Sequence, residues 1–282
     1  MAESGWGMAG TVRSVWRTAV VVFSLIVRQF NSISNFAAVV SRLSSLLEAI
    51  EKSHLTELAT IETVKRDGPL TYEGLTLNSP GSELSLIKEL SVSIPFGVNV
   101  LVDGTTHPPG AALFKATAGM PTQGTGRINR PPDVMFLPQR PYLPSGTLRE
   151  MLVNPEAESE IIPDDQIVRV LHEAGLERLF NQVGGLDVEQ NWEKILPLSE
   201  QHLLALASVL LAAPRFVVLD RLEMTFGSEQ FRKILRLLFE RSITCINIGK
   251  AVAERNLYQA FLEYGEDGRW TWTDDPPINR GH

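Results

Sequence analysis

The pattern of apolar and polar positions predicts a domain of alternating strands and helices that begins near residue 70 and ends near residue 275. Short apolar or alternating runs indicate strands at residues 70–79, 90–97, 98–102, 134–137, 215–220 and 244–249, and a hairpin at 261–273. Helical spacing indicates helices at residues 111–119, 147–153, 163–174, 176–182, 200–213 and 231–241. Because strands alternate with helices, we expect an α/β fold with a parallel or mixed sheet covered on both faces.

The segment before this domain has a different pattern. Apolar residues recur at helical spacing over residues 23–52, which predicts a long amphipathic helix whose apolar stripe needs a partner. The apolar run at residues 18–27 is about half of the roughly 20 residues that a helix needs to span a bilayer. Two interpretations stay open: the helix packs on its own domain, or it is the cytoplasmic end of a membrane helix. Residues 54–69 are polar and predict a linker, and residues 276–282 form a tail.

Residues 134–152 combine a short strand, a proline-stiffened loop and a helix start. Thr147 and Glu150 have the spacing of a capping box, which predicts that the helix begins at Thr147. Gln139 follows the strand directly, where a side-chain amide can meet a ligand above the sheet. The alternative is an ordinary connection between strand and helix.

A second strand, loop and helix run from residue 98 to residue 119. The strand ends in Asp103-Gly104, and the helix closes at Gly119. This is the context in which a phosphate-binding loop lies.

Composition narrows the class of protein. The chain has 282 residues and a formal net charge of −7, so it has no electrostatic footprint for nucleic acid. Cys245 is the only cysteine, which excludes a disulfide framework and fits a reducing compartment. The five histidines lack the spacing of metal ligands.

Several separated blocks resemble a known family. FLPQRPYLPSGTLREML, followed by a helical segment and by LPLSEQHLLALASVLLAAPRFVVLD, is similar to the ATP-binding cassette of ABC transporters. The likeness is to subfamily D, the peroxisomal fatty-acyl transporters and their bacterial relatives. It implies a P-loop NTPase-like fold over residues 70–275, with a sheet core, an antiparallel β part and a helical subdomain at about 147–213. Residues 1–53 resemble the end of the last transmembrane helix and its cytoplasmic extension.

The same resemblance implies ligands and partners. It implies ATP and Mg²⁺ as cofactors, a transmembrane domain or membrane subunit as partner, and a second cassette with which this one would form a homodimer or heterodimer. It also implies a membrane-associated protein with its cassette on the cytoplasmic side.

The phosphate loop departs from the family pattern G-x-x-x-x-G-K-[ST]. In the segment GTTHPPGA, which begins at Gly104, the second glycine falls at Pro109, the lysine at Gly110 and the hydroxyl residue at Ala111. Pro108 and Pro109 have no N–H to donate to phosphate. Lys115 lies over a turn further along the helix and does not simply replace the missing lysine. The sequence therefore predicts poor phosphate binding.

The catalytic positions are altered as well. Asp220 matches the aspartate that supports magnesium, but Arg221 replaces the catalytic glutamate and Lys250 replaces the switch histidine. An arginine stays protonated and cannot act as a general base. The remnant of the nucleotide site would consist of Gly104, Gly110, Gln139 and Asp220, with Asp220 as the Mg²⁺ ligand.

Two further contacts of the family are also changed. The signature LSLGEQ reads LPLSEQ, with Pro197 for the serine and Ser199 for the glycine, and the D-loop reads MTFG from Met224 to Gly227. Tyr72 is the nearest candidate for the aromatic residue that stacks on adenine.

Three functional hypotheses follow. The first is a non-hydrolysing cassette that acts as a structural or regulatory part of a transporter and docks through the Gln139 loop. The second is the ATPase half of an asymmetric transporter that drives transmembrane transport. The third is a truncated, non-functional remnant, since the family expects several spanning helices ahead of the cassette.

Overall fold

The computed structural model describes residues 16, 36, 39–47, 61–82, 84–104, 107–153, 162–250 and 255–274. The chain divides into two units, Met1–Leu58 and Ala59–His282. In the first unit, residues 39–47 are helical and their apolar side chains are exposed, namely Val39, Val40, Leu43, Leu46 and Leu47. The rest of the long helix predicted over residues 23–52, apart from residue 36, lies outside the described residues, so that prediction is not supported.

The apolar run at residues 18–27 also lies outside the described residues. None of the helices in the described part of the chain is both long and apolar enough to cross a membrane.

A six-stranded sheet forms the centre of the second unit, with the order β10-β9-β4-β8-β7-β6. Five strands run parallel, and β10 pairs with β9 in the antiparallel direction. The strands are β4 (Val100–Gly104), β6 (Val134–Leu137), β7 (Phe216–Asp220), β8 (Thr244–Ile248), β9 (Ala260–Tyr264) and β10 (Trp270–Asp274). The predicted mixed α/β class is confirmed.

A second sheet of four strands has the order β1-β5-β2-β3. Its strands are β1 (Glu62–Lys65), β2 (Leu70–Asn78), β3 (Ser85–Ile94) and β5 (Gly124–Arg130). The apolar pattern predicts β2 and the second half of β3, but it does not predict β1 or β5. Strand β5 reads GTGRINR, in which Ile128 is the only large apolar residue, and β1 lies within the polar segment that predicts a linker.

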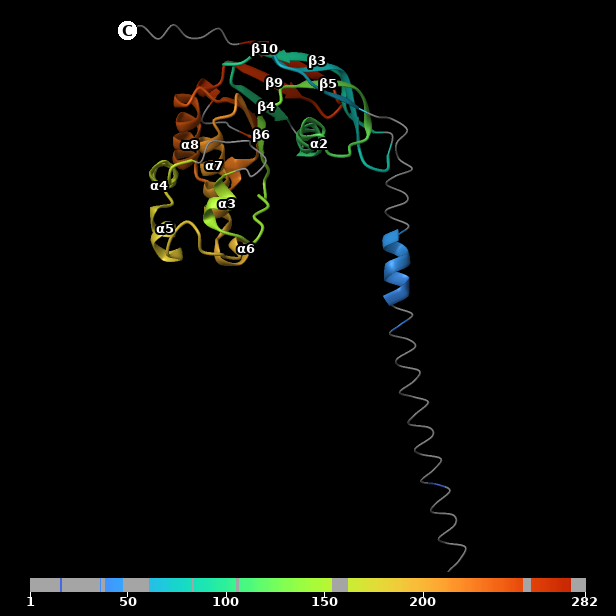
Figure 1. Cartoon of the computed structure of the whole chain (residues 1–282). Helices are drawn as coiled ribbons and strands as arrows, with labels where there is room; N and C mark the ends of the chain where they lie inside the picture. The colour runs from blue at the N-terminus through green and yellow to red at the C-terminus, as the bar shows by residue number, and fades with distance from the viewer. Residues whose placement is uncertain are drawn as a thin grey trace, which may run out of the picture. The chain divides into compact units, whose positions relative to one another are not determined.

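The helices cover the large sheet on both faces (Figure 1). On one face, Leu101, Val217 and Leu219 pack with the helices from α3 onward, and on the other face Val100 and Val102 pack with α2 and the four-stranded sheet. The helices are α2 (His107–Ala118), α3 (Leu148–Leu152), α4 (Asp164–Glu173), α5 (Glu177–Val183), α6 (Trp192–Ile195), α7 (Leu198–Ala212) and α8 (Ser228–Glu240), with short 3-10 turns η1 (Leu222–Met224) and η2 (Arg255–Leu257).

Helix α2 begins earlier than predicted, at His107 rather than at residue 111. Pro108 and Pro109 therefore lie in its first turn. Proline is tolerated there because the N–H groups of a first helical turn have no partner within the helix. The sequence pattern, which reads prolines as loop residues, places the helix start too late.

The predicted capping box at the start of α3 is confirmed. The Thr147 hydroxyl accepts a hydrogen bond from the Glu150 N–H (3.2 Å), and the Glu150 carboxylate accepts one from the Thr147 N–H (2.7 Å). The fully buried Trp192 on α6 donates its ring N–H to the Gly146 carbonyl oxygen at 2.9 Å. These bonds fix the proline-rich loop against the helical part of the unit.

Candidate functional site

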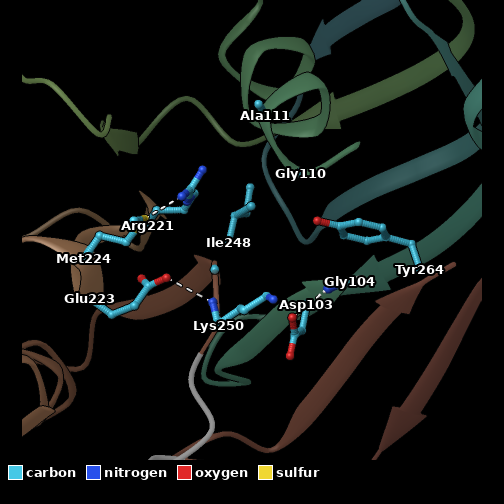
Figure 2. Close-up of a pocket in the computed structure, with 11 residues that line it drawn as sticks. Asp103, Gly104, Gly110, Ala111, Arg221, Glu223, Met224, Ile248, Lys250 and Tyr264 are labelled. Atoms are coloured by element: carbon cyan, nitrogen blue, oxygen red, sulfur yellow. Dashed lines mark hydrogen bonds between the residues drawn. The ribbon is translucent and has the colours of Figure 1, made fainter. Parts of the chain in front are cut away.

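A pocket of about 410 Å³ lies at the carboxyl ends of the parallel strands. Ligands of open α/β sheets bind at this edge. Strand β4, helix α2, the η1 turn, the end of β8 and the end of β9 all contribute to its wall (Figure 2). Its lining residues are Asp103, Gly104, Gly110, Ala111, Arg221, Glu223, Met224, Ile248, Gly249, Lys250 and Tyr264.

The loop between β4 and α2 forms one side of the pocket, as its sequence context predicts. Gly104 and Gly110 both line it, together with Ala111. The first turn of α2 offers few amide donors, because Pro108 and Pro109 carry no N–H. The donor set of a phosphate cradle is thus reduced where the helix N-terminus faces the pocket.

Tyr264, which the sequence does not mark as a site residue, lies against this loop. Parallel pairing of β4 and β9 sets Tyr264 directly beside Gly104. A β-carbon at Gly104 would lie 2.0 Å from Cε2 of the tyrosine ring, so only glycine fits under the ring. The Tyr264 hydroxyl lies beside Gly110, where an added β-carbon would be 2.8 Å from the hydroxyl oxygen, and it points into the pocket (Figure 2). Burial raises the pKa of Tyr264, so the hydroxyl is neutral at physiological pH.

Gln139 and Asp220 are brought together outside the pocket lining. Burial raises the pKa of Asp220 above its usual value, while the Gln139 backbone N–H and the charge of Lys115 lower it by smaller amounts. The Oδ1 atom of Asp220 has no hydrogen-bond partner. The charge of Lys115 therefore reaches this carboxylate, which helical spacing alone does not predict.

The η1 turn supplies the opposite wall of the pocket. Arg221 adopts a left-handed backbone conformation (φ 55°), and its guanidinium donates to the Met224 sulfur. Glu223 accepts a 2.9 Å hydrogen bond from the Lys250 backbone N–H. Burial raises the pKa of Glu223, and the neighbouring Arg221 charge lowers it by a smaller amount. Glu223 is a second acid that sequence reasoning missed, although it follows Asp220 closely in the chain.

The structure contradicts Tyr72 as the candidate for stacking on adenine. Its side chain is 3% exposed, and its hydroxyl lies 2.9 Å from the Thr117 hydroxyl. Burial raises the pKa of Tyr72 to about 12. The ring belongs to the core between α2 and the four-stranded sheet and has no free face for a base.

Comparison with known proteins identifies the fold's relatives. The chain is 33% identical over 266 residues to an uncharacterized ABC transporter ATP-binding protein of Synechocystis sp., over 91% of this chain and 40% of that protein. It is 30% identical over 215 residues to the lysosomal cobalamin transporter ABCD4 of Homo sapiens, over 72% of this chain and 36% of that protein. It is also 26% identical over 296 residues to the chloroplastic ABC transporter D family member 2 of Arabidopsis thaliana, over 80% and 42%. No protein-family model matches the chain.

The chain is a homologue of ABC transporter ATP-binding proteins. Its relatives include subfamily D members, as the sequence blocks indicate. It spans about two fifths of the length of these relatives.

The residues of this cassette do not match the needs of a bound magnesium nucleotide. The lysine and hydroxyl positions of the loop are Gly110 and Ala111. The position after Asp220 is a cation, Arg221, and the Tyr264 hydroxyl lies against Gly110. In the part of the chain that the structure describes, no group of three or more His, Cys, Asp or Glu side chains could hold a metal ion.

Proposed function

We propose that this chain is a non-hydrolysing ATP-binding cassette that serves as a structural or regulatory component of an ABC-type membrane transporter. The observation that carries the proposal is the pocket at the carboxyl ends of the strands. It keeps the position of the family's nucleotide site, while the charges and donors around it have changed. Arg221 and Lys250 stand where the family has its catalytic glutamate and its switch histidine.

The known size of single-contact effects on enzyme rates supports a loss of ATP turnover. Removing one preorganised electrostatic contact typically slows an enzyme by about a hundredfold to a thousandfold. Here the loop lysine, the magnesium hydroxyl and the general base are all absent from their positions. Such losses are not additive, but all act in the same direction.

The proposed partner is a transmembrane domain or membrane subunit, with a second cassette as its counterpart, so that the cassette lies on the cytoplasmic side of a membrane. The docking surface would be the proline-stiffened loop that follows Gln139. Tyr142 in this loop is 82% exposed, so its ring is accessible to a partner.

An ATPase assay with the purified chain tests the catalytic part of the proposal. We expect no magnesium-dependent turnover above the background given by the Asp220→Asn variant, alone or with a candidate partner cassette. Turnover in the wild type that Asp220→Asn abolishes would favour the alternative, the ATPase half of an asymmetric transporter.

Co-purification from native membranes tests the structural part. We expect a membrane subunit to co-purify with the wild type, and Tyr142→Ser to weaken that association by about tenfold or more, the size of an aromatic hot spot. Leu84→Ser is the matched control, because Leu84 is 64% exposed on a different loop. Equal recovery with both variants would exclude this docking surface, and the absence of any membrane partner would favour a non-functional remnant.

A further inference from the structure

Strand pairing places an aromatic side chain where a phosphate group would need space. Gly104 and Tyr264 are register partners on β4 and β9. The ring covers Gly104 so closely that a β-carbon there would lie within 2.4 Å of three of its atoms. The glycine that begins the loop motif therefore makes room for a tyrosine.

The hydroxyl of the same side chain lies against the loop. A β-carbon at Gly110 would lie 2.8 Å from Tyr264 Oη. In a phosphate loop, backbone amides donate to phosphate oxygens. An incoming phosphate would have to displace the tyrosine oxygen, and the adjacent Pro108 and Pro109 offer no replacement donor.

The neutral charge of the Tyr264 side chain fits a loop that has no lysine. The Tyr264 side chain is 8% exposed, and burial favours its neutral form. A neutral hydroxyl beside Gly110 brings no charge into the pocket, whereas a phosphate group requires nearby cations. The carboxylate of Asp103, another lining residue, further disfavours an anion at this place.

We propose that Tyr264 is the specificity-determining residue of this pocket: it is a built-in occupant of the phosphate cradle and excludes phosphate and polyphosphate groups. This inference rests on the proposed non-hydrolysing function and identifies the side chain that closes the site. This inference concerns whether a phosphate group can bind at the loop, whereas the altered catalytic positions concern the hydrolysis of ATP.

The test uses the full chain with Tyr264→Leu, which removes the ring edge and the hydroxyl, and Tyr264→Phe as the matched control that keeps the ring. The probe is inorganic pyrophosphate, and the readout is the shift of the thermal unfolding midpoint with probe concentration. We expect saturable stabilisation of Tyr264→Leu at concentrations about tenfold or more below any effect on the wild type, because the smaller side chain leaves the space beside Gly104 open. Tyr264→Phe should behave as the wild type, because its ring still covers Gly104.

A second measurement keeps the proposal testable if Tyr264→Leu does not fold. Tyr264→Met, which fills the site with a flexible apolar side chain and no ring, should show the same pyrophosphate response as Tyr264→Leu. A folded Tyr264→Leu or Tyr264→Met variant that responds to pyrophosphate as the wild type does would overturn the proposal. The proposed function fails separately, through wild-type ATP turnover that depends on Asp220.

Discussion

The backbone N–H of Lys250 donates a 2.9 Å hydrogen bond to the carboxylate of Glu223, joining the end of β8 to the η1 turn across the pocket. A β-carbon at the intervening Gly249 would lie 2.3 Å from the same carboxylate. Glu223 is thus held among backbone groups, and its second oxygen has no hydrogen-bond partner. The position of the family's switch histidine is fixed in this cassette through a main-chain contact.

This arrangement predicts how stability depends on pH. Burial raises the folded-state pKa of Glu223 above its ordinary value of 4.5. The folded state therefore binds a proton more tightly than the unfolded state, and this group's contribution to stability falls as pH rises from about 4.5 through the folded-state pKa. Glu223→Gln cannot ionise, so its free energy of unfolding should fall less than that of the wild type over this range.

Urea unfolding at pH 4.5 and at about pH 7 measures the difference. Glu223→Ala should also lose about 1 kcal/mol at either pH, since the Lys250 amide loses its acceptor. A pH dependence in Glu223→Gln equal to that of the wild type would show that Glu223 does not titrate with folding.

The contact between Gly104 and Tyr264 predicts a strong coupling between substitutions. Gly104→Ala should destabilise the cassette by about 1 to 3 kcal/mol, because the new methyl group overlaps the tyrosine ring. In the Tyr264→Leu background the same substitution should cost less, with a coupling of about 1 kcal/mol or more in the double-mutant cycle. Gly227→Ala is the control, since a β-carbon there has no neighbour within 4 Å. Additive effects would mean that the ring does not cover Gly104.

Trp192 is predicted to be a main support of the helical part. It is fully buried, and its ring N–H donates to Gly146 at 2.9 Å. Trp192→Phe should cost about 2 kcal/mol, from the lost hydrogen bond and the space left behind. Trp270→Phe loses a bond of the same length, to the Lys88 carbonyl oxygen, from a partly exposed position on β10, so it should cost less than half as much. Urea unfolding of both variants measures the two losses. Equal losses in the free energy of unfolding would contradict the role assigned to burial.

Much of the fold could be predicted from the apolar pattern. The buried strands of the large sheet are short continuous apolar runs such as VVL in β7, and the capping box marks the start of α3. Strands β1 and β5 could not be found in this way, because their stability comes from pairing in the four-stranded sheet rather than from their own apolar residues. Helix α6 is too short for helical periodicity to show.

Only part of the candidate site is carried by local motifs. Of the four residues that the sequence assigns to a nucleotide site, Gly104 and Gly110 line the pocket, whereas Gln139 and Asp220 lie outside its lining. Tyr264 was missed because its role depends on the register between β4 and β9, which are more than a hundred residues apart in the chain. Glu223 was missed because the left-handed conformation of Arg221 and the 3-10 turn set its direction, and neither has a signal in the sequence pattern.

The register of β4 against β9 also limits what changes within the loop alone can achieve. Restoring glycine, lysine and serine at residues 109–111 would rebuild the phosphate-loop motif, yet the ring from the neighbouring strand would still cover Gly104. Under the role proposed for Tyr264, a gain of phosphate binding therefore needs changes in two segments, the loop and β9.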